Sequence, residues 1–141
     1  MNDLKRFAGA QERDYAAALS EIRGGRKRTH WMWYIFPQIA GLGLSETSRF
    51  YAIRDVSEAE EFLAHPVLGR RLVEISNALL EVEGKTANQI FGSPDDMKLK
   101  SSMTLFGALD ETNPVFQNVL NKYFSGAKDE KTLQLISHPE N

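Results

Sequence analysis

Apolar residues recur every three or four positions along four stretches of the chain, which is the spacing of one face of an α-helix. The first stretch, residues 4–22, ends at a pair of glycines, and the second, residues 68–82, begins just after a proline and precedes Gly84. The third, residues 93–109, opens with Ser93 as its predicted cap, followed by a proline and two first-turn acids, and the fourth, residues 115–124, follows Asn-Pro. The pattern therefore predicts four long helices.

Shorter segments between these stretches each begin at a residue type that commonly caps a helix. The candidate caps are Ser45, Ser57, Thr86 and Asp129. Glu60 would complete a capping box with Ser57. No Asn-Gly or Asp-Gly dipeptide marks a β-hairpin anywhere in the sequence. These segments therefore add short helices to the four long ones.

Residues 31–36 are the one segment with strand character. This apolar run fits a buried strand or a short buried helix, because so brief a run has no readable period. Taken together, the elements predict an all-α fold. We expect a compact multihelical single domain over residues 1–141, with about seven to eight helices, four of them long.

Composition and charge fit an ordinary globular protein. The chain has 141 residues, 42% of them apolar and 26% charged, which suits one core. No apolar run is long enough for a bilayer or a signal peptide, so we expect a cytoplasmic protein with no membrane contact. The absence of cysteine excludes disulfides, thiolate nucleophiles and Cys-ligated zinc. A formal net charge of −2 disfavours a general nucleic-acid binder without excluding one.

Several polar side chains lie on the predicted apolar faces of the helices. Gln11 lies near the centre of the first apolar stripe, so its amide either ties two helices together or lines a polar pocket. On the third predicted helix, Lys98 and Lys100 lie among apolar neighbours, and Ser102 follows Lys98 by one turn. Each lysine must reach water, pair with an acid such as Asp95, or point into a wet cavity.

Residues 23–38 contain the highest concentration of candidate functional side chains, with four cations in six positions followed by an aromatic block. The cations are Arg23, Arg26, Lys27 and Arg28. Charge segregated in this way attracts anions, although a basic loop can equally be a solvated turn. Trp31 and Trp33 in the aromatic block either offer ring faces for stacking or fill the core.

No pattern in the sequence indicates a metal or a cofactor. The three histidines are scattered singly, with no pair at metal-ligand spacing and no adjacent carboxylate pattern. Only His30, which lies beside the cationic loop, is a candidate for proton transfer. We therefore expect no metal and no cofactor, and the sequence leaves open whether the protein is an enzyme.

Motifs from nearly the whole chain match one protein family. They include residues 25–38, Leu4-Lys5-Arg6-Phe7, Gly41-Leu42-Gly43, His65-Pro66 and Ser101-Ser102-Met103-Thr104-Leu105-Phe106. On these motifs the sequence resembles a widespread bacterial family known as domain of unknown function 1810, some of whose members carry the automated name calpastatin. The resemblance implies a compact multihelical domain and no established reaction. The calpastatin name has no support in these residues, because such a calpain inhibitor would be long, disordered and repetitive.

The family motifs contain the residues singled out above on physical grounds, namely Gln11, residues 26–38, and Lys98 with Ser101 and Ser102. Their combination of Trp, Lys and Gln is distantly similar to that of small helical domains that process ADP-ribose-type adducts. This likeness is an analogy between residue sets and not between sequences.

The leading hypothesis is a polar pocket for a small anionic, phosphate-bearing ligand of the nucleotide or ADP-ribose type. The predicted ligand-binding residues are Gln11, Arg26, Lys27, Arg28, Trp31, Trp33, Gln38, Lys98, Lys100, Ser101 and Ser102. His30 is the predicted catalytic residue if a reaction takes place. The alternative is a non-enzymatic interaction module that docks nucleic acid or an acidic protein through the basic loop. The sequence leaves the oligomeric state open.

Overall fold

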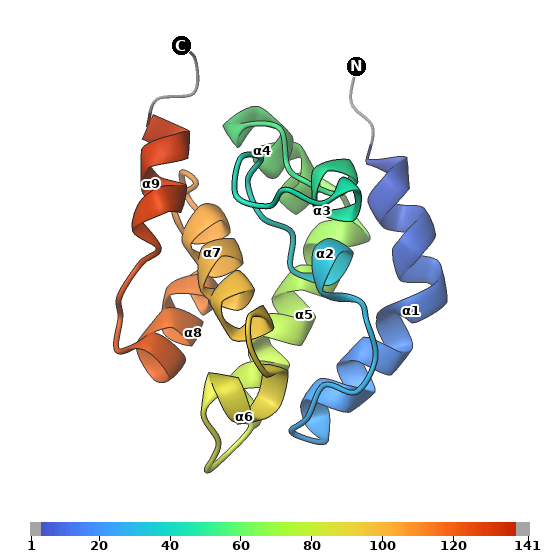
Figure 1. Ribbon diagram of the computed structural model, residues 1–141, viewed down its shortest axis with the longest axis vertical. Helices are drawn as coiled ribbons and strands as arrows, with labels where there is room; N and C mark the ends of the chain where they lie inside the picture. The colour runs from blue at the N-terminus through green and yellow to red at the C-terminus, as the bar shows by residue number, and fades with distance from the viewer. Residues whose placement is uncertain (1–3, 138–141) are drawn as a thin grey trace.

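The computed structural model describes residues 4–137, and every regular element in that range is a helix (Figure 1). The helices are α1 (Lys5–Arg23), α2 (Met32–Ile35), α3 (Glu46–Phe50), α4 (Val56–Ala64), α5 (Leu68–Glu81), α6 (Ala87–Phe91), α7 (Asp95–Gly107), α8 (Val115–Phe124) and α9 (Glu130–Ser137). The all-α prediction is confirmed, and the four long helices are α1, α5, α7 and α8.

The ambiguous segment of residues 31–36 contains the short helix α2. Trp31 and Phe36, which flank it, are buried together with three of its four residues, so apolar surface is covered on several sides at once. A strand would need a hydrogen-bonding partner along its edge, and the described residues offer only one isolated bridge, between Ile39 and Ile53. The helix count in the described range therefore reaches nine, one more than the upper sequence-based number.

Helix caps follow the sequence at three places and depart from it at two. Ser45, Thr86 and Asp129 each accept a hydrogen bond from a backbone amide three residues further along. The capping box at Ser57 is wrong, because α4 is capped by Asp55, whose carboxylate accepts from the Glu58 amide at 2.9 Å.

The prediction of a Ser93 cap on α7 is also wrong, because no side chain caps this helix. The amide of Asp96 in its first turn donates instead to the carbonyl of Gly92 at 2.9 Å. Asp95 and Asp96 still place negative charge in the first turn, where it complements the helix dipole.

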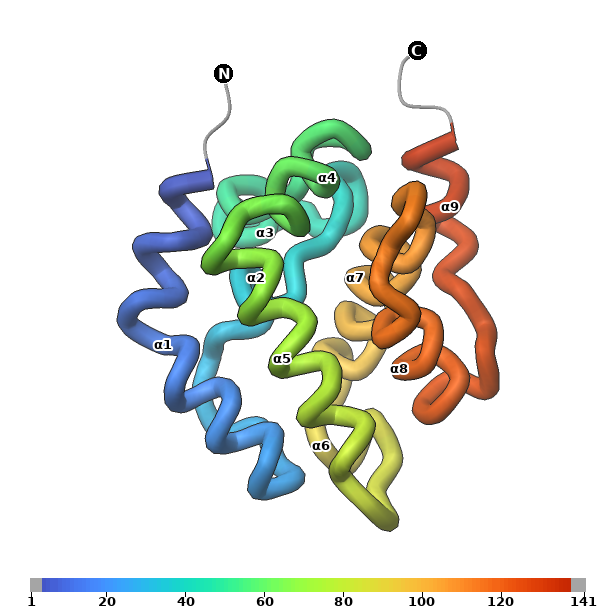
Figure 2. Tube along the Cα trace, turned by 180° about the vertical axis from the view of Figure 1, so that it is seen from behind, coloured from blue at the N-terminus to red at the C-terminus, as the bar shows by residue number. Residues whose placement is uncertain are grey.

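The long helices pack around a central helix, α5. Figure 2 shows α5 running between α1 on one side and α8 on the other, with α9 at the outer edge beyond α8, while α2, α3 and α7 lie on the face behind α5. Four fully buried phenylalanines connect α1, α4, α7 and α8 in series, with ring centroids 5.1, 5.5 and 5.9 Å apart. They are Phe7, Phe62, Phe106 and Phe116. This aromatic series lies within one continuous core.

Glycine is required at Gly25 by its backbone conformation and at Gly69 by close packing. At Gly25, φ is +82°, and this residue and Arg26 donate their amides back to the last turn of α1, which ends the helix where the sequence predicts. At Gly69, a Cβ atom would lie 1.9 Å from the carbonyl oxygen of Leu63, so α4 and α5 meet at a corner that only glycine permits.

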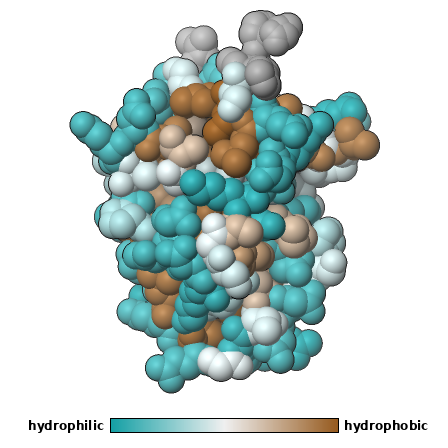
Figure 3. Space-filling view, turned by 90° about the vertical axis from the view of Figure 1, so that its left-hand side faces the viewer, coloured by the Kyte–Doolittle hydropathy of each residue, from teal (hydrophilic) through white to brown (hydrophobic). Residues whose placement is uncertain are grey.

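The side of the molecule that carries α9 is mostly hydrophilic, with apolar side chains gathered toward its upper end (Figure 3). Among residues 4–137, none of the helices has the length and apolar character that a membrane crossing requires.

Candidate functional site

The loop that follows α1 folds around the carboxylate of Glu21. One carboxylate oxygen accepts hydrogen bonds from the amides of Arg28 and Thr29 at 2.8 and 3.1 Å and from the indole of Trp31 at 2.8 Å. The other accepts from the Thr29 hydroxyl at 2.7 Å. Burial alone would raise the pKa of Glu21, but these hydrogen bonds outweigh it and lower the pKa to about 2.

Glu21 is not among the site residues predicted from the sequence, and the only signal for it is an acid in the last turn of a helix just before a cationic loop. Because Glu21 occupies the amides of Arg28 and Thr29, these backbone groups already bind an internal anion. The order of the loop therefore does not require an external ligand.

Lys27 and Lys98 share the carboxylate of Asp95. The Lys27 Nζ lies 3.0 Å from one carboxylate oxygen and the Lys98 Nζ lies 3.4 Å from the other. The side chain of Lys27 is only 8% exposed, whereas that of Lys98 is 25% exposed. Since two lysines meet one carboxylate, the group has one positive charge in excess. Pairing with Asp95 is one of the three alternatives that the sequence left open for Lys98, whereas the arrival of Lys27 from the basic loop was not predicted.

Each of these lysines also lies over an indole ring. The Lys27 Nζ is 5.1 Å from the ring centroid of Trp31, and the Lys98 Nζ is 5.3 Å from that of Trp33. Trp31 is 1% exposed and packs in the core, whereas Trp33 is partly exposed. The basic loop, the aromatic block and the start of α7 therefore meet at one place, which brings Lys27, Trp31, Trp33 and Lys98 together.

A cleft of about 250 Å³ opens beside Lys98. Its walls come from the segment before and within α3, the first half of α7 and the residue that caps α9. The lining residues are Gln38, Leu42, Gly43, Ser48, Pro94, Met97, Lys98, Ser101 and Asp129. A small notch that Trp33 lines shares three of these residues, Gln38, Gly43 and Ser48. We call this combined space the Lys98 cleft.

The wall formed by residues 41–48 depends on close packing at glycine. A Cβ atom on Gly43 would lie 2.4 Å from the Cβ of Ser48, so a larger residue would push this wall apart. Ser48 is held in turn by Ser45, whose hydroxyl donates to the Ser48 hydroxyl at 2.9 Å and accepts from its amide at 3.0 Å. The glycine-rich segment therefore shapes the cleft.

Some polar groups of the Lys98 cleft already form hydrogen bonds within the protein, and others do not. The Ser101 hydroxyl donates to the carbonyl of Met97 at 3.2 Å. One carboxylate oxygen of Asp129 accepts from the amide and hydroxyl of Thr132. The other oxygen of Asp129 and the amide side chain of Gln38 form no hydrogen bond within residues 4–137. The cleft thus offers a carboxylate oxygen and an amide for further hydrogen bonds.

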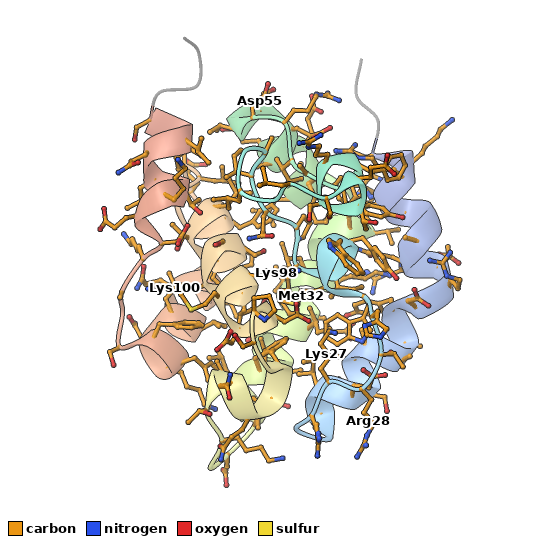
Figure 4. All side chains as sticks on the ribbon, viewed as in Figure 1. Lys27, Arg28, Met32, Asp55, Lys98 and Lys100 are labelled. Carbon is orange, nitrogen blue, oxygen red and sulfur yellow. The ribbon has the colours of Figure 1, made fainter. Side chains whose placement is uncertain are left out.

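Lys100 and Ser102 do not line this cleft. Figure 4 shows Lys98 and Lys100 on opposite sides of α7, and the Lys100 Nζ lies 6.0 Å from the ring centroid of Phe124 in α8. Ser102 is fully buried, and its hydroxyl is the one buried side-chain polar atom without a partner in the described part of the chain.

Gln11 also lies apart from the Lys98 cleft. Its side chain is buried, its Nε2 donates to the carbonyl of Tyr34 at 2.8 Å, and its Oε1 accepts from Arg71 at 3.4 Å. The amide therefore links α1 to α2 and α5, which is the first of the two interpretations that the sequence allowed.

The remaining predicted residues, Arg26, Arg28 and His30, are exposed on the basic loop. Figure 4 shows Arg28 directed away from the body of the molecule. None of the three lines the Lys98 cleft, and neither arginine forms an ion pair within the described range. Over the same range, no three His, Cys, Asp or Glu side chains are grouped to hold a metal ion.

Comparison with known proteins places these features in a family. One solved structure, described as a conserved hypothetical protein, Rv1873, from Mycobacterium tuberculosis, is 45% identical in sequence, covers 96% of each chain and superposes with a TM-score of 0.94. No curated protein matches the sequence. The family model described as protein of unknown function (DUF1810) matches residues 1–136. The chain therefore belongs to the DUF1810 family.

Proposed function

We propose that the protein binds a small phosphate-bearing anion in the Lys98 cleft. The observation that carries this proposal is the position of Lys98, which lines the cleft as the more exposed of two lysines that share one carboxylate. An ammonium whose counter-charge is shared retains attraction for a further anion. A phosphate oxygen that reached Lys98 would form a charge-assisted hydrogen bond.

The surroundings of Lys98 suit an organic phosphate of the nucleotide or ADP-ribose type. Trp33 offers a partly exposed ring beside the same cleft, and such a ring face can stack against a base. Gln38 and Ser101 lie on the walls, where they would orient polar atoms of the ligand. In this proposal Arg26 and Arg28 attract the anion from a distance, and His30 is the proton-transfer group if the bound ligand reacts.

A thermal-shift titration with nucleotides and ADP-ribose tests the proposal. A ligand present at one hundred times its dissociation constant adds about 2.7 kcal/mol to the stability of the folded state. We expect Lys98→Met to weaken binding roughly tenfold or more, because it removes a charge-assisted hydrogen bond. Lys100→Met, which removes an equal charge from the other side of α7, is the matched control and leaves affinity within about twofold. The absence of a shift with every phosphate compound overturns the proposal.

A second function is favoured by a different observation, the exposure of Arg26 and Arg28 without an ion pair in the described range. In this alternative the basic loop docks nucleic acid or an acidic protein, and the protein is not an enzyme. Binding of this kind weakens steeply as salt rises and is lost in the Arg26→Ala, Arg28→Ala double variant. Lys27 is left unchanged in that variant, because its ion pair with Asp95 also supports the fold.

We also propose a cytoplasmic location. It rests on the absence of cysteine, which suits a reducing compartment. Fractionation of cells that produce the tagged protein from its own promoter tests this location.

A further inference from the structure

We infer that the ligand of the Lys98 cleft is a small sugar phosphate, whose phosphate meets Lys98 while its hydroxyls meet Asp129 and Gln38. This inference rests on the proposed function and narrows its ligand class. It begins from the presence of a carboxylate in a cleft that is proposed to bind an anion.

The carboxylate of Asp129 repels an anion that enters the Lys98 cleft. A ligand made only of a phosphate group would gain attraction from Lys98 and lose part of it to repulsion from Asp129, which lines the same cleft. The repulsion is offset only if the ligand presents hydrogen-bond donors to the carboxylate. One oxygen of Asp129 is held by Thr132, which fixes the side chain, and the other has no partner within residues 4–137. A hydroxyl group is the donor that a phosphate ester of a sugar supplies, and carboxylates bind ribose hydroxyls in other nucleotide sites.

Gln38 extends the hydrogen-bonding capacity of Asp129. Its side-chain amide has no partner in the described part of the chain, and it can both donate to and accept from a hydroxyl. Ser48 and Ser101 add two neutral hydroxyl groups to the same walls. A set of one carboxylate, one amide and two hydroxyls matches several alcohol groups better than it matches a second charge.

The apolar part of the cleft and its size limit the ligand further. Pro94, Leu42 and the 48% exposed Met97 supply apolar surface, against which the carbon–hydrogen face of a sugar ring can pack. The volume of about 250 Å³ lies below the range of roughly 300–1,000 Å³ typical of pockets that hold drug-sized ligands. A monosaccharide phosphate, which is also the ribose phosphate portion of a nucleotide, therefore fits this space.

The experiment compares three probes by titration calorimetry: ribose 5-phosphate, methyl phosphate and phosphoethanolamine. We expect ribose 5-phosphate to bind at least tenfold more tightly than methyl phosphate, because only the sugar provides hydroxyls to Asp129 and Gln38. Asp129→Asn should remove most of this preference and leave methyl phosphate binding unchanged or stronger. Asparagine is as good a helix cap as aspartate, so α9 keeps its start, and Gln38→Leu gives an independent loss of the same preference.

The outcomes separate this inference from the proposed function. If all three probes bind equally well, lose affinity in Lys98→Met and do not respond to Asp129→Asn, the sugar-phosphate inference is overturned and the phosphate cleft stands. If phosphoethanolamine binds tightest, Asp129 recognises an ammonium group, and the inference is overturned in favour of a zwitterion. If no probe binds, the sugar-phosphate inference is overturned, and the proposed function falls with it only if nucleotides and ADP-ribose also give no thermal shift.

Discussion

Glu21 orders the basic loop after α1, although the sequence of that loop suggests a binding site for external anions. The cations at Arg26 and Arg28 dominate the sequence of this loop, yet the group that orders it is a single carboxylate on α1. Hydrogen bonds to a charged acceptor contribute more than neutral ones, so Glu21 has a large share in holding the loop in place.

Glu21→Gln tests this role and its pH dependence. We expect the variant to lower the free energy of unfolding at pH 7 by about 1.5–3 kcal/mol, because the charged acceptor is lost. The pKa of Glu21 is lowered in the folded state from its ordinary value of 4.5 to about 2, so its contribution is complete above pH 4.5 and is lost as pH falls toward 2. Urea unfolding at pH 7, 4 and 2.5 measures the difference between the variant and the original chain. A difference that stays constant over this range contradicts the assigned role.

Ser102 and Thr104 form a matched pair on one helix. Ser102 buries a hydroxyl without a partner, whereas the Thr104 hydroxyl donates to the carbonyl of Lys100 and accepts from the amide of Asp129. We expect Ser102→Ala to leave stability unchanged or to raise it by about 1 kcal/mol, since a desolvated polar group is removed. Thr104→Val should lower stability by about 1–3 kcal/mol, because it leaves the Asp129 amide unpaired. Equal losses in urea unfolding would show that Ser102 has a partner, such as a bound water.

At the scale of elements, periodicity predicted most of the helices because it reports on one face of a segment and needs no knowledge of the neighbours. The long helices α1, α5, α7 and α8 were all identified in this way. The caps at Ser57 and Ser93 were wrong for a local reason: Asp55, two residues before Ser57, was available as a competing cap, and α7 begins without any side-chain cap. The segment 31–36 could not be decided, because its packing partners lie elsewhere in the chain.

The close packing of α4 against α5 at Gly69 predicts how substitutions of glycine change stability. A methyl group at Gly69 would meet the carbonyl of Leu63 at 1.9 Å, so Gly69→Ala should lower the free energy of unfolding by about 1–3 kcal/mol or more through overpacking. Gly9→Ala is the control, because Gly9 lies in α1 with no atom within 4 Å of an added Cβ. Alanine there should raise stability by roughly 0.5–1 kcal/mol. Thermal melts in which both variants change the melting temperature in the same direction would contradict the close packing described at Gly69.

At the scale of the whole molecule, the sequence indicated which polar side chains lie on apolar faces but not which of them meet. A helical projection correctly placed Gln11 and Lys98 on the apolar faces of their helices, yet Gln11 packs against Tyr34 and Arg71 and does not line the Lys98 cleft. The cleft is assembled from segments separated by up to 91 positions along the chain, from Gln38 to Asp129. Its composition is therefore set by tertiary packing, which no local pattern records.

The same assembly makes ligand binding depend on a residue that does not line the cleft. Lys27 arrives from the basic loop and neutralises Asp95, which leaves Lys98 with attraction for an anion. In Lys27→Met, Lys98 must balance Asp95 alone, so we expect the affinity for a phosphate ester to fall roughly five- to tenfold although no direct contact is removed. Arg26→Met removes an equal charge from an exposed position on the same loop and should change affinity by less than about twofold at physiological salt. Titration of both variants with the tightest-binding probe measures the difference, and equal affinities would show that the charge shared at Asp95 does not govern the cleft.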